Sequence, residues 1–172
     1  MVKLLGAVLV LLAATLAGFM KAGQYASRPH QIRRLILALK RLETEIAYGF
    51  TPLPEALQRI ALQSSEPIKG LFEEAARGMI SPANWTAQQS LHHAVQAGWK
   101  QTAMKAAEKE VLLQLAFTLG TSDRTNQLGH IATAVRQLES EELAAREEQA
   151  RYEKMSRSLG VLGGAFIVIL LY

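Results

Sequence analysis

The chain has 172 residues, 49% of them hydrophobic, and a formal net charge of +4. This length predicts one domain of ordinary size, and the apolar content is compatible with a globular core or with a small domain between membrane segments. The lack of cysteine excludes disulfide bonds and thiolate ligands, but it is compatible with either redox compartment.

The first element is an apolar run at residues 4–20, seventeen uncharged residues between Lys3 and Lys21. As a helix it is about 25 Å long against a hydrocarbon core of about 30 Å, the lower limit for a transmembrane helix. A cleaved signal peptide is the alternative, with Lys3 as its charged start. The run is longer than the usual signal-peptide core, and Phe19, Met20 and Lys21 interrupt the small-residue cleavage pattern, so a retained anchor is favoured.

Residues 24–158 form a predicted helical domain, because every strongly periodic segment has helical spacing and none alternates like a strand. The first helix is predicted at 29–48, with Pro29 in its first turn and Gly49 after its end. One face of this helix carries an apolar stripe of Ile32, Leu35, Ile36, Leu39, Leu42 and Ile46.

Two shorter helices are expected next. The prolines of TPLP, residues 51–54, suit a turn into the second helix but not a helix interior. The core face of that helix is predicted to be Leu53, Leu57, Ile60 and Ala61. The third helix is predicted from Pro67 to Arg77, and Gly78 is its expected end.

A fourth helix is predicted to have Ser81 as its N-cap and Pro82 in its first turn, and to end near Gly98. Its expected core residues are Trp85, Leu91 and Val95. A fifth helix is predicted to end at Gly120, with the apolar stripe Met104, Ala107, Val111, Leu115 and Leu119.

The sixth helix is predicted to be long. Asp123 is expected to cap it, and Leu128, Ile131, Val135 and Leu138 form its apolar stripe. Beyond that stripe, Glu–Arg pairs at i,i+4 spacing each add about 0.2–0.5 kcal/mol and favour one continuous helix; they are Glu142–Arg146, Glu147–Arg151 and Glu153–Arg157. The predicted fold class is all-α: a compact bundle of about six helices between two transmembrane helices, the last helix continuous with the C-terminal anchor.

The C-terminal anchor is predicted at residues 159–172, LGVLGGAFIVILLY, which have no polar face. The segment is about 21 Å long as a helix, yet its apolar residues favour insertion by roughly 3–5 kcal/mol. With both ends in one membrane, the domain lies on one side of it. Basic residues are concentrated on the domain side of both anchors, so the positive-inside rule predicts a cytoplasmic domain.

No catalytic, metal or cofactor site is predicted. The four histidines have no metal-binding i+3 or i+4 spacing and are expected at the surface; they are His30, His92, His93 and His130. The glycines of GVLGG lack the lysine and helix start of a phosphate-binding loop. We therefore expect a protein that is not an enzyme and binds no cofactor.

Six basic residues from Lys21 to Arg41 precede the first acidic residue, Glu43. Nucleic-acid binding is one interpretation, but contact with anionic lipid headgroups beside the anchor is favoured over it. A solvated flank is as compatible with the pattern as lipid contact. The candidate lipid contacts are Lys21, Arg28, Arg33, Arg34, Lys154 and Arg157.

Two stretches carry a resemblance to known proteins: RRLILALKRLETEIAYGFTPLPEALQRIA, from Arg33, and LLQLAFTLGTSDRTNQLGHIATAVRQLE, from Leu112. With the apolar C-terminus, they resemble the stage III sporulation protein AB family of endospore-forming bacteria. They resemble more distantly the cytoplasmic helical domain of type II secretion F and type IV pilus platform proteins. The most specific steps, G-x-T-P-L-x-x-A-L and L-G-x-x-D-R-x-x-Q, place structural roles on Gly49, Pro52, Leu53, Ala56, Leu57, Leu119, Gly120, Asp123 and Gln127.

The resemblance implies a multi-pass component of the channel-like assembly that links mother cell and forespore, located in the mother-cell (outer forespore) membrane. It implies other membrane proteins of that assembly and its cytoplasmic ATPase as partners, besides membrane lipid and further copies of the chain. The F proteins have two such domains and three membrane segments, whereas this chain has one domain and two predicted anchors. The alternative is an extracytoplasmic helical adaptor in the intermembrane space, after cleavage of the N-terminal segment.

Overall fold

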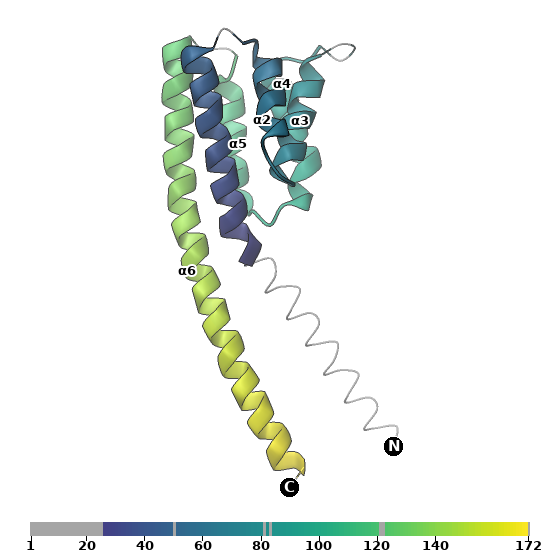
Figure 1. Cartoon of the computed structure of the whole chain (residues 1–172), viewed down its shortest axis with the longest axis vertical. Coiled ribbons are helices and arrows are strands. Elements are labelled where there is room, and N and C mark those ends of the chain that lie inside the picture. Colours follow the sequence, from purple (N-terminus) through teal and green to yellow (C-terminus); the bar gives the residue numbers. More distant parts are fainter. Residues whose placement is uncertain (1–25, 50, 81, 83, 121–122, 172) are drawn as a thin grey trace.

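A computed structural model of the chain describes residues 26–49, 51–80, 82, 84–120 and 123–171, and the only regular elements in these ranges are helices (Figure 1). The predicted anchor at 4–20 lies outside the described residues. Residues 159–171 are helical, but their side chains are not described. Among the described residues, no helix combines the length and the apolar character needed to cross a bilayer, so the two predicted spans are not confirmed.

The N-terminal helix, residues 26–48, is the first described element. Its predicted stripe is confirmed: the residues from Ile32 to Leu42 on that face are buried, and Ile46 packs on the core from a partly exposed position. The predicted start is wrong, because the chain is already helical at residue 26 and Pro29 lies within the helix. Gly49 follows its end, as predicted, and donates to the Glu45 carbonyl at 2.8 Å.

The next two helices are α2 (Leu53–Leu62) and α3 (Ile68–Met79). Leu57, Ile60 and Ala61 are buried, as predicted. The predicted end of α3 is wrong, because the helix continues through Gly78. A Cβ at Gly78 would lie 2.6 Å from the Oγ of Ser90, so this glycine lets α3 pack closely against α4.

The helix α4 (Ala87–Gly98) begins later than predicted and continues into the short 3₁₀ helix η1 (Trp99–Gln101). Its cap is Thr86, whose Oγ1 accepts from the Gln89 N–H at 3.2 Å, while the Gln89 Oε1 accepts from the Thr86 N–H at 3.1 Å. This T-x-x-Q pairing is a capping box, which satisfies two helix-start donors at once and outweighs the Ser-Pro pair upstream. Trp85 therefore precedes the helix and is partly exposed, not in the core as predicted.

The last two helices are α5 (Ala106–Thr118) and α6 (Arg124–Leu171). Gly120 has φ +81° in the turn between them, a value that L side chains rarely adopt. The Oδ1 of Asp123 accepts from the Asn126 N–H at 2.8 Å, so the predicted cap is confirmed. The 48 residues of α6 make a rod roughly 70 Å long at 1.5 Å per residue, as the continuous-helix prediction required.

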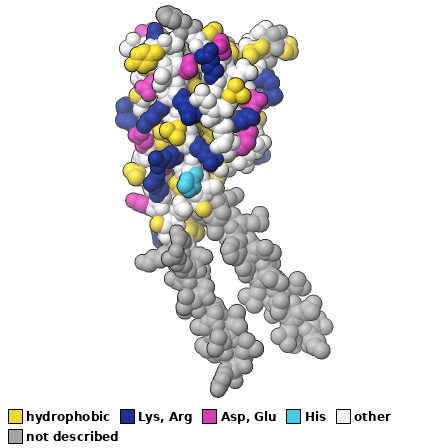
Figure 2. Space-filling model, in the orientation of Figure 1, with side chains coloured by type: hydrophobic (Ala, Val, Ile, Leu, Met, Phe, Trp, Pro, Cys, Tyr) yellow, Lys and Arg dark blue, Asp and Glu magenta, His cyan; other side chains and the backbone are white. Residues whose placement is uncertain are grey.

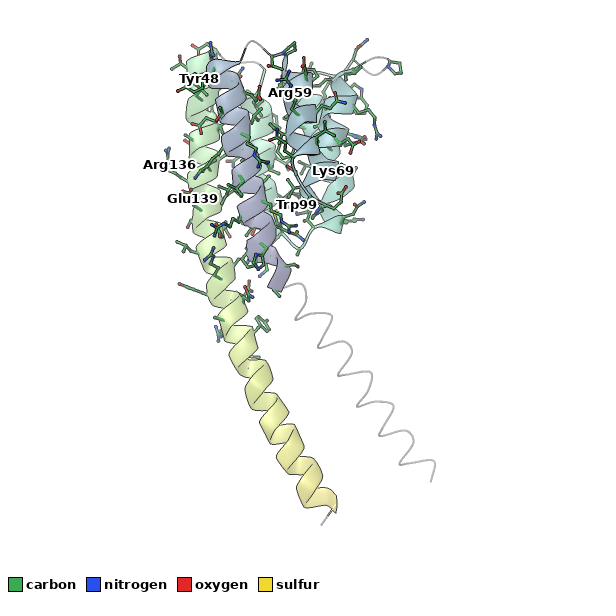
Figure 3. The ribbon with its side chains drawn as sticks, in the orientation of Figure 1. Tyr48, Arg59, Lys69, Trp99, Arg136 and Glu139 are labelled. Atoms are coloured by element: carbon green, nitrogen blue, oxygen red, sulfur yellow. The ribbon has the colours of Figure 1, made fainter. Side chains whose placement is uncertain are left out.

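Consecutive helices from α2 to α6 pack against each other, and the N-terminal helix lies beside α6 (Figure 1). We call the end of the bundle beyond which α6 extends the proximal end. The described part of the N-terminal helix begins there, and the Ala103 N–H donates to the Gln31 Oε1 at 2.7 Å. The opposite, distal end holds the turn from α5 to α6. Figure 3 shows Tyr48 at the distal end and Trp99 toward the proximal end.

Candidate functional site

Five charged side chains come together at the proximal end, from the N-terminal helix, the start of α5 and the middle of α6. We call them the charged cluster: Arg28, Lys105, Glu108, Glu141 and Glu148. Arg28 is only 5% exposed and Glu108 is fully buried. Charged residues are seldom buried this deeply unless they are paired, so their partners determine what the site does.

Arg28 is the centre of the cluster. Its Nε donates to the Glu108 Oε1 at 2.8 Å, and its two terminal nitrogens donate to Glu148 at 2.8 Å and Glu141 at 3.2 Å. One guanidinium thus satisfies three carboxylates from two other helices, a task that its rigid fork of donors suits. The arrangement fixes the N-terminal helix against α5 and α6 simultaneously.

Glu108 and Lys105 extend the cluster at the start of α5. The second oxygen of Glu108 accepts from the Lys105 backbone N–H at 2.8 Å, which satisfies one of the unpaired donors at the helix N-terminus. The Lys105 ammonium lies 2.6 Å from the Glu148 Oε1. Its hydrogen bond lowers the pKa of the Glu148 carboxyl below the ordinary value; burial opposes the shift, and Arg28 adds to it.

A groove of about 900 Å³ lies beside the cluster and is lined by α5, α6 and Arg28. Alanines form part of its wall, and Tyr152 and Met155 of α6 extend it away from the bundle. The carboxylates of the cluster are occupied by ion pairs, and the described residues contain no group of three or more ligands for a metal ion. The geometry therefore supports mechanical coupling between helices.

The distal end holds a second bridge between segments far apart in the sequence. The Arg124 side chain, at the start of α6, donates from Nε to the Ile46 carbonyl at 2.6 Å and from a terminal nitrogen to the Ala47 carbonyl. These are among the last carbonyls of the N-terminal helix, which have no partner within the helix. Arg124 belongs to the second of the two most specific sequence steps, and its bonds reach the end of the helix that precedes the first step.

Known proteins resemble this chain over nearly its whole length. The family model of stage III sporulation protein AB matches residues 3–172. The chain belongs to the stage III sporulation protein AB family. A family member from Bacillus subtilis (strain 168) is 42% identical over 171 residues, which is 99% of each chain. A solved structure of a stage III sporulation protein AB has a TM-score of 0.69 and 38% identity, and covers 73% of this chain and 98% of its own.

These comparisons confirm the resemblance over nearly the whole chain and support the all-helical fold. The relatives are named as sporulation proteins and not as enzymes. The predicted link to sporulation is therefore shown at the level of the family.

The family-motif residues lie in the two distal turns. Ala56, Leu57 and Leu119 are buried, whereas Pro52 is exposed at the start of α2. The remaining positions are also at these turns or in the first turn of the following helix: Gly49, Leu53, Gly120, Asp123 and Gln127. Their structural roles stay a prediction, although Gly120 and Asp123 have the conformation and the hydrogen bond that such roles require.

The predicted lipid contacts separate into three groups. The prediction is wrong for Arg28, because its guanidinium is buried among carboxylates of the protein itself. Arg33 and Arg34 are exposed, and Arg34 donates to the Glu66 carbonyl at 3.4 Å. Lys21 lies outside the described residues, as do the side chains of Lys154 and Arg157, so for these positions lipid contact stays a prediction.

Sequence reasoning missed Glu108 as a cluster residue. Its position does carry a signal: Glu108 follows Met104 by four residues and precedes Val111 by three, so it lies on the apolar stripe of α5. The structure buries Glu108 and leaves Ala107, the predicted stripe residue, exposed. A charged residue on a core stripe predicts a buried partner, but nothing local identifies Arg28, which lies 80 residues away.

Proposed function

We propose that this family member is a non-enzymatic membrane component of the sporulation channel, or secretion-like assembly, between mother cell and forespore. Its helical domain acts there as a platform or adaptor that couples a cytoplasmic ATPase to the other proteins of the assembly. The family and its sporulation names support the process. The membrane location rests on the two apolar segments of the sequence.

The observation that carries this proposal is the arrangement of the proximal end. The N-terminal helix begins there, α6 extends beyond it, and the charged cluster joins the two helices. Chain segments that leave a bundle at the same end can enter the same bilayer without crossing the domain. This arrangement supports two anchors in one membrane, with α6 as a continuous connection from the bundle to the apolar C-terminus.

Protease accessibility tests the location. With an antibody to residues 24–158, we expect digestion of the domain in inverted membrane vesicles and protection in intact sporulating cells, because a cytoplasmic domain is exposed only after inversion. Digestion from the outer face, once other membranes are removed, would place the domain between the two membranes. Mass spectrometry of the native N-terminus completes the test, since loss of about twenty residues means cleavage of the first segment.

The non-enzymatic role has its own test. The isolated domain, residues 24–158, is expected to be helical and to release no phosphate from ATP or GTP. Circular dichroism establishes that it is folded, and a phosphate-release assay at high protein concentration measures turnover. Turnover that survives further purification and scales with the folded fraction would contradict the adaptor role, whatever the membrane location.

A further inference from the structure

The outward face of the N-terminal helix carries basic residues with a leucine among them. We call it the basic face: Arg33, Arg34, Lys40 and Arg41, with Leu37 at its centre. From residue 33 to residue 41 the sequence has these four cations and no acidic residue, and all five side chains of the basic face are exposed. Figure 1 shows this helix in front of α5. Figure 2, in the same orientation, shows Lys and Arg side chains with hydrophobic side chains between them, together with Asp and Glu.

Two of the arginines are held in place without being neutralised. Arg41 donates to the Gln63 carbonyl at 3.0 Å and Arg34 donates to the Glu66 carbonyl at 3.4 Å, both in the turn between α2 and α3. The carboxylate of Glu66 accepts instead from the Gly70 N–H at 3.2 Å. A carbonyl oxygen orients a guanidinium but carries no counter-charge, and each guanidinium has further N–H donors. A cation that is already positioned loses less side-chain entropy when a partner binds.

The carboxylates on the α6 side of the basic face neutralise only one of its cations. Lys40 pairs with Glu139 at 2.8 Å. Glu142 shares a hollow of about 220 Å³ with Arg33, but Glu142 pairs with Arg146 at 2.6 Å. Among the described residues, three cations of the basic face therefore have no carboxylate partner; they are Arg33, Arg34 and Arg41.

Exposed apolar side chains lie beside these cations. Leu37 is 49% exposed, and it follows Arg34 by three residues and precedes Arg41 by four, so the three share one side of the helix. Leu62 is 75% exposed and immediately precedes Gln63, the residue whose carbonyl holds Arg41. Fixed cations beside exposed leucines are complementary to a partner that is both acidic and apolar.

The direction of the helix favours an acidic protein over an anionic membrane. The described part begins at residue 26, at the proximal end, and Arg41 lies about 22 Å farther along the axis at 1.5 Å per residue. The attraction of anionic headgroups falls off within a Debye length of about 8–10 Å. Arg41 is therefore out of reach of a bilayer at the proximal end. A nucleic acid is also a poorer match, because its phosphate backbone offers no apolar surface to Leu37 and Leu62.

A second copy of this chain offers one acidic and apolar region, around Leu143 on α6, which is 65% exposed. The glutamates near Leu143 already have basic partners or neighbours: Glu139 pairs with Lys40, Glu142 with Arg146, and Glu141 and Glu148 with Arg28, while Glu147 has Arg151 four residues on. Docking there exchanges existing ion pairs for new ones, so it gains less than a partner with unpaired carboxylates.

The more exposed apolar residues of a second copy are Tyr48, at 84%, and Leu62, at 75%. Tyr48 follows Arg41 by two helical turns, and Leu62 adjoins Gln63, so both lie beside the basic face itself. Contact through either residue brings the basic faces of two copies together, which the repulsion of like charges opposes. A different protein is therefore the better occupant.

We propose that the basic face docks an acidic, partly apolar segment of a different protein. Carboxylates of that segment pair with Arg34 and Arg41, and its apolar side chains contact Leu37 and Leu62. A guanidinium accepts a carboxylate through two parallel hydrogen bonds, so these arginines also fix the orientation of the segment. The site deepens the adaptor role and rests on it only in that an adaptor binds another protein. It does not depend on which side of the membrane the domain occupies.

Fluorescence anisotropy with a labelled synthetic peptide tests this proposal on the full chain in a neutral detergent. The probe is a helical peptide with a leucine at its centre and glutamates one turn before and after it, the complement of the basic face. We expect binding that weakens as salt is raised, and none for a matched peptide with lysine in place of glutamate. Arg34→Glu combined with Arg41→Glu should reduce the affinity for the glutamate peptide about tenfold or more and create binding of the lysine peptide.

Arg59→Glu combined with Arg77→Glu is the matched control. It makes the same change in net charge at two exposed arginines away from the basic face, which pair with Glu55 and Glu74. This control should change the affinity less than about twofold. Leu37→Ser should weaken binding about fivefold and leave its salt dependence unchanged, because it removes apolar contact and no charge. Circular dichroism establishes that each variant is folded, as expected for exposed positions.

The opposing outcomes are equally definite. No binding of the glutamate peptide, or equal losses from the two arginine pairs, overturns the proposal, because net charge alone would then account for any attraction. Phosphatidylglycerol vesicles or duplex DNA that bind with the same dependence on Arg34 and Arg41 overturn the protein partner. Self-association of the full chain in sedimentation velocity, if Arg34→Glu with Arg41→Glu abolishes it, makes a second copy the occupant and also overturns the proposal. The protease and phosphate-release tests are independent, because they measure location and turnover and not peptide binding.

Discussion

At the proximal end of the bundle, five charged side chains converge and two of them are buried, whereas at the distal end Trp85 and Phe117 remain partly exposed around a groove. The usual distribution of residues, charge outside and apolar inside, is reversed at both ends. The reversal has a different consequence at each end. Buried charges that are fully paired restrict how helices move, while exposed and ordered aromatic rings are available to a partner.

The comparison indicates that ion pairs hold the helices together at the proximal end, whereas the aromatic side chains at the distal end are available for binding. Arg28 contacts carboxylates on two other helices, so a change there affects how the N-terminal helix, α5 and α6 are joined. Trp85 contacts α3 at Gly78 and α4 at His93. Substitutions at the proximal end should therefore reduce stability most, and substitutions at the distal end should reduce it less.

Arg28→Ala is expected to have the largest effect on stability. Among the partners that the structure describes, it leaves the fully buried Glu108 with the Lys105 backbone N–H, and removing one member of a buried ion pair costs about 3–5 kcal/mol. That is a large part of the stability of an ordinary domain. Urea unfolding of residues 24–158 measures the free energy of unfolding.

The matched control for Arg28→Ala is Lys40→Ala. Lys40 pairs with Glu139 at 2.8 Å, so it joins the same two helices, the N-terminal helix and α6, but both side chains are about half exposed. Figure 3 shows Glu139 on α6 beside the N-terminal helix. Exposed pairs contribute about 0–1 kcal/mol. Equal losses for Arg28→Ala and Lys40→Ala would mean that burial of the charged cluster contributes nothing to its effect.

Gly78→Ala is expected to have the next largest effect, at the distal end. The new Cβ would meet the Ser90 Oγ at 2.6 Å and the Trp85 ring at 2.9 Å. Overpacking of this kind costs about 1–3 kcal/mol and displaces the indole. Urea unfolding measures the cost, and the tryptophan emission spectrum reports the displacement.

A second glycine supplies the control for that substitution. Gly129 lies in α6, and a Cβ there meets nothing within 4 Å. Gly129→Ala should therefore increase the free energy of unfolding, by about 1 kcal/mol, because alanine is the better helix former. If Gly129→Ala also lost stability, the gain expected from the helix propensity of alanine would be wrong. The loss expected from the close contact at Gly78 would not be contradicted.

The sequence was sufficient for the parts of the fold that depend on local patterns. The stripe from Ile32 to Leu42 and the continuous α6 follow from helical periodicity and from good helix formers. Asp123 was recognised as a cap because its oxygen needs only a donor three residues away. The start of α4 was missed because two local signals compete, and Thr86 with Gln89 forms the better cap.

Neither the charged cluster nor the exposed position of Trp85 was predicted from the sequence, for two separate reasons. Arg28 was assigned to lipid because it follows an apolar segment within a basic run, and its carboxylate partners are 80 or more residues away. Trp85 was assigned to the core as part of a helix predicted to begin at Ser81, yet the turn that ends at Thr86 places it at the surface. For Arg28 the deciding contacts are between helices, which single-helix patterns do not specify, and for Trp85 the deciding feature is the capping box at Thr86.

The pH dependence of stability tests the charged cluster of the proximal end. The folded-state pKa of Glu148 is below its ordinary value of 4.5, chiefly because of the hydrogen bond from Lys105. A lowered pKa means that the pair stabilises the fold above the unfolded-state pKa, and that this contribution is lost as pH falls through the folded-state pKa. Lys105→Ala should therefore be less stable than the parent chain near pH 7, and the difference should shrink in acid.

Urea unfolding from pH 7 to pH 3 measures this difference. Glu148→Gln is the control, because it removes the titrating group: adding Lys105→Ala to it should give a difference in stability that changes little over the same range. A gap between the parent chain and Lys105→Ala that is constant with pH would mean that Lys105 acts through packing and not through the Glu148 charge.

Ser90→Ala is expected to have the smallest effect. Ser90 is 1% exposed and its Oγ has no hydrogen-bond partner among the described residues, so its removal should change stability by less than about 1 kcal/mol, most simply as a gain. The variant also tests the contact at Gly78. Since the hydroxyl is the nearest atom to a Cβ at that position, Gly78→Ala combined with Ser90→Ala should be less destabilised than the sum of the two single changes. If the free-energy changes of the two substitutions are strictly additive, the Trp85 ring alone opposes the new methyl group. The close packing at the distal end then serves to position the indole.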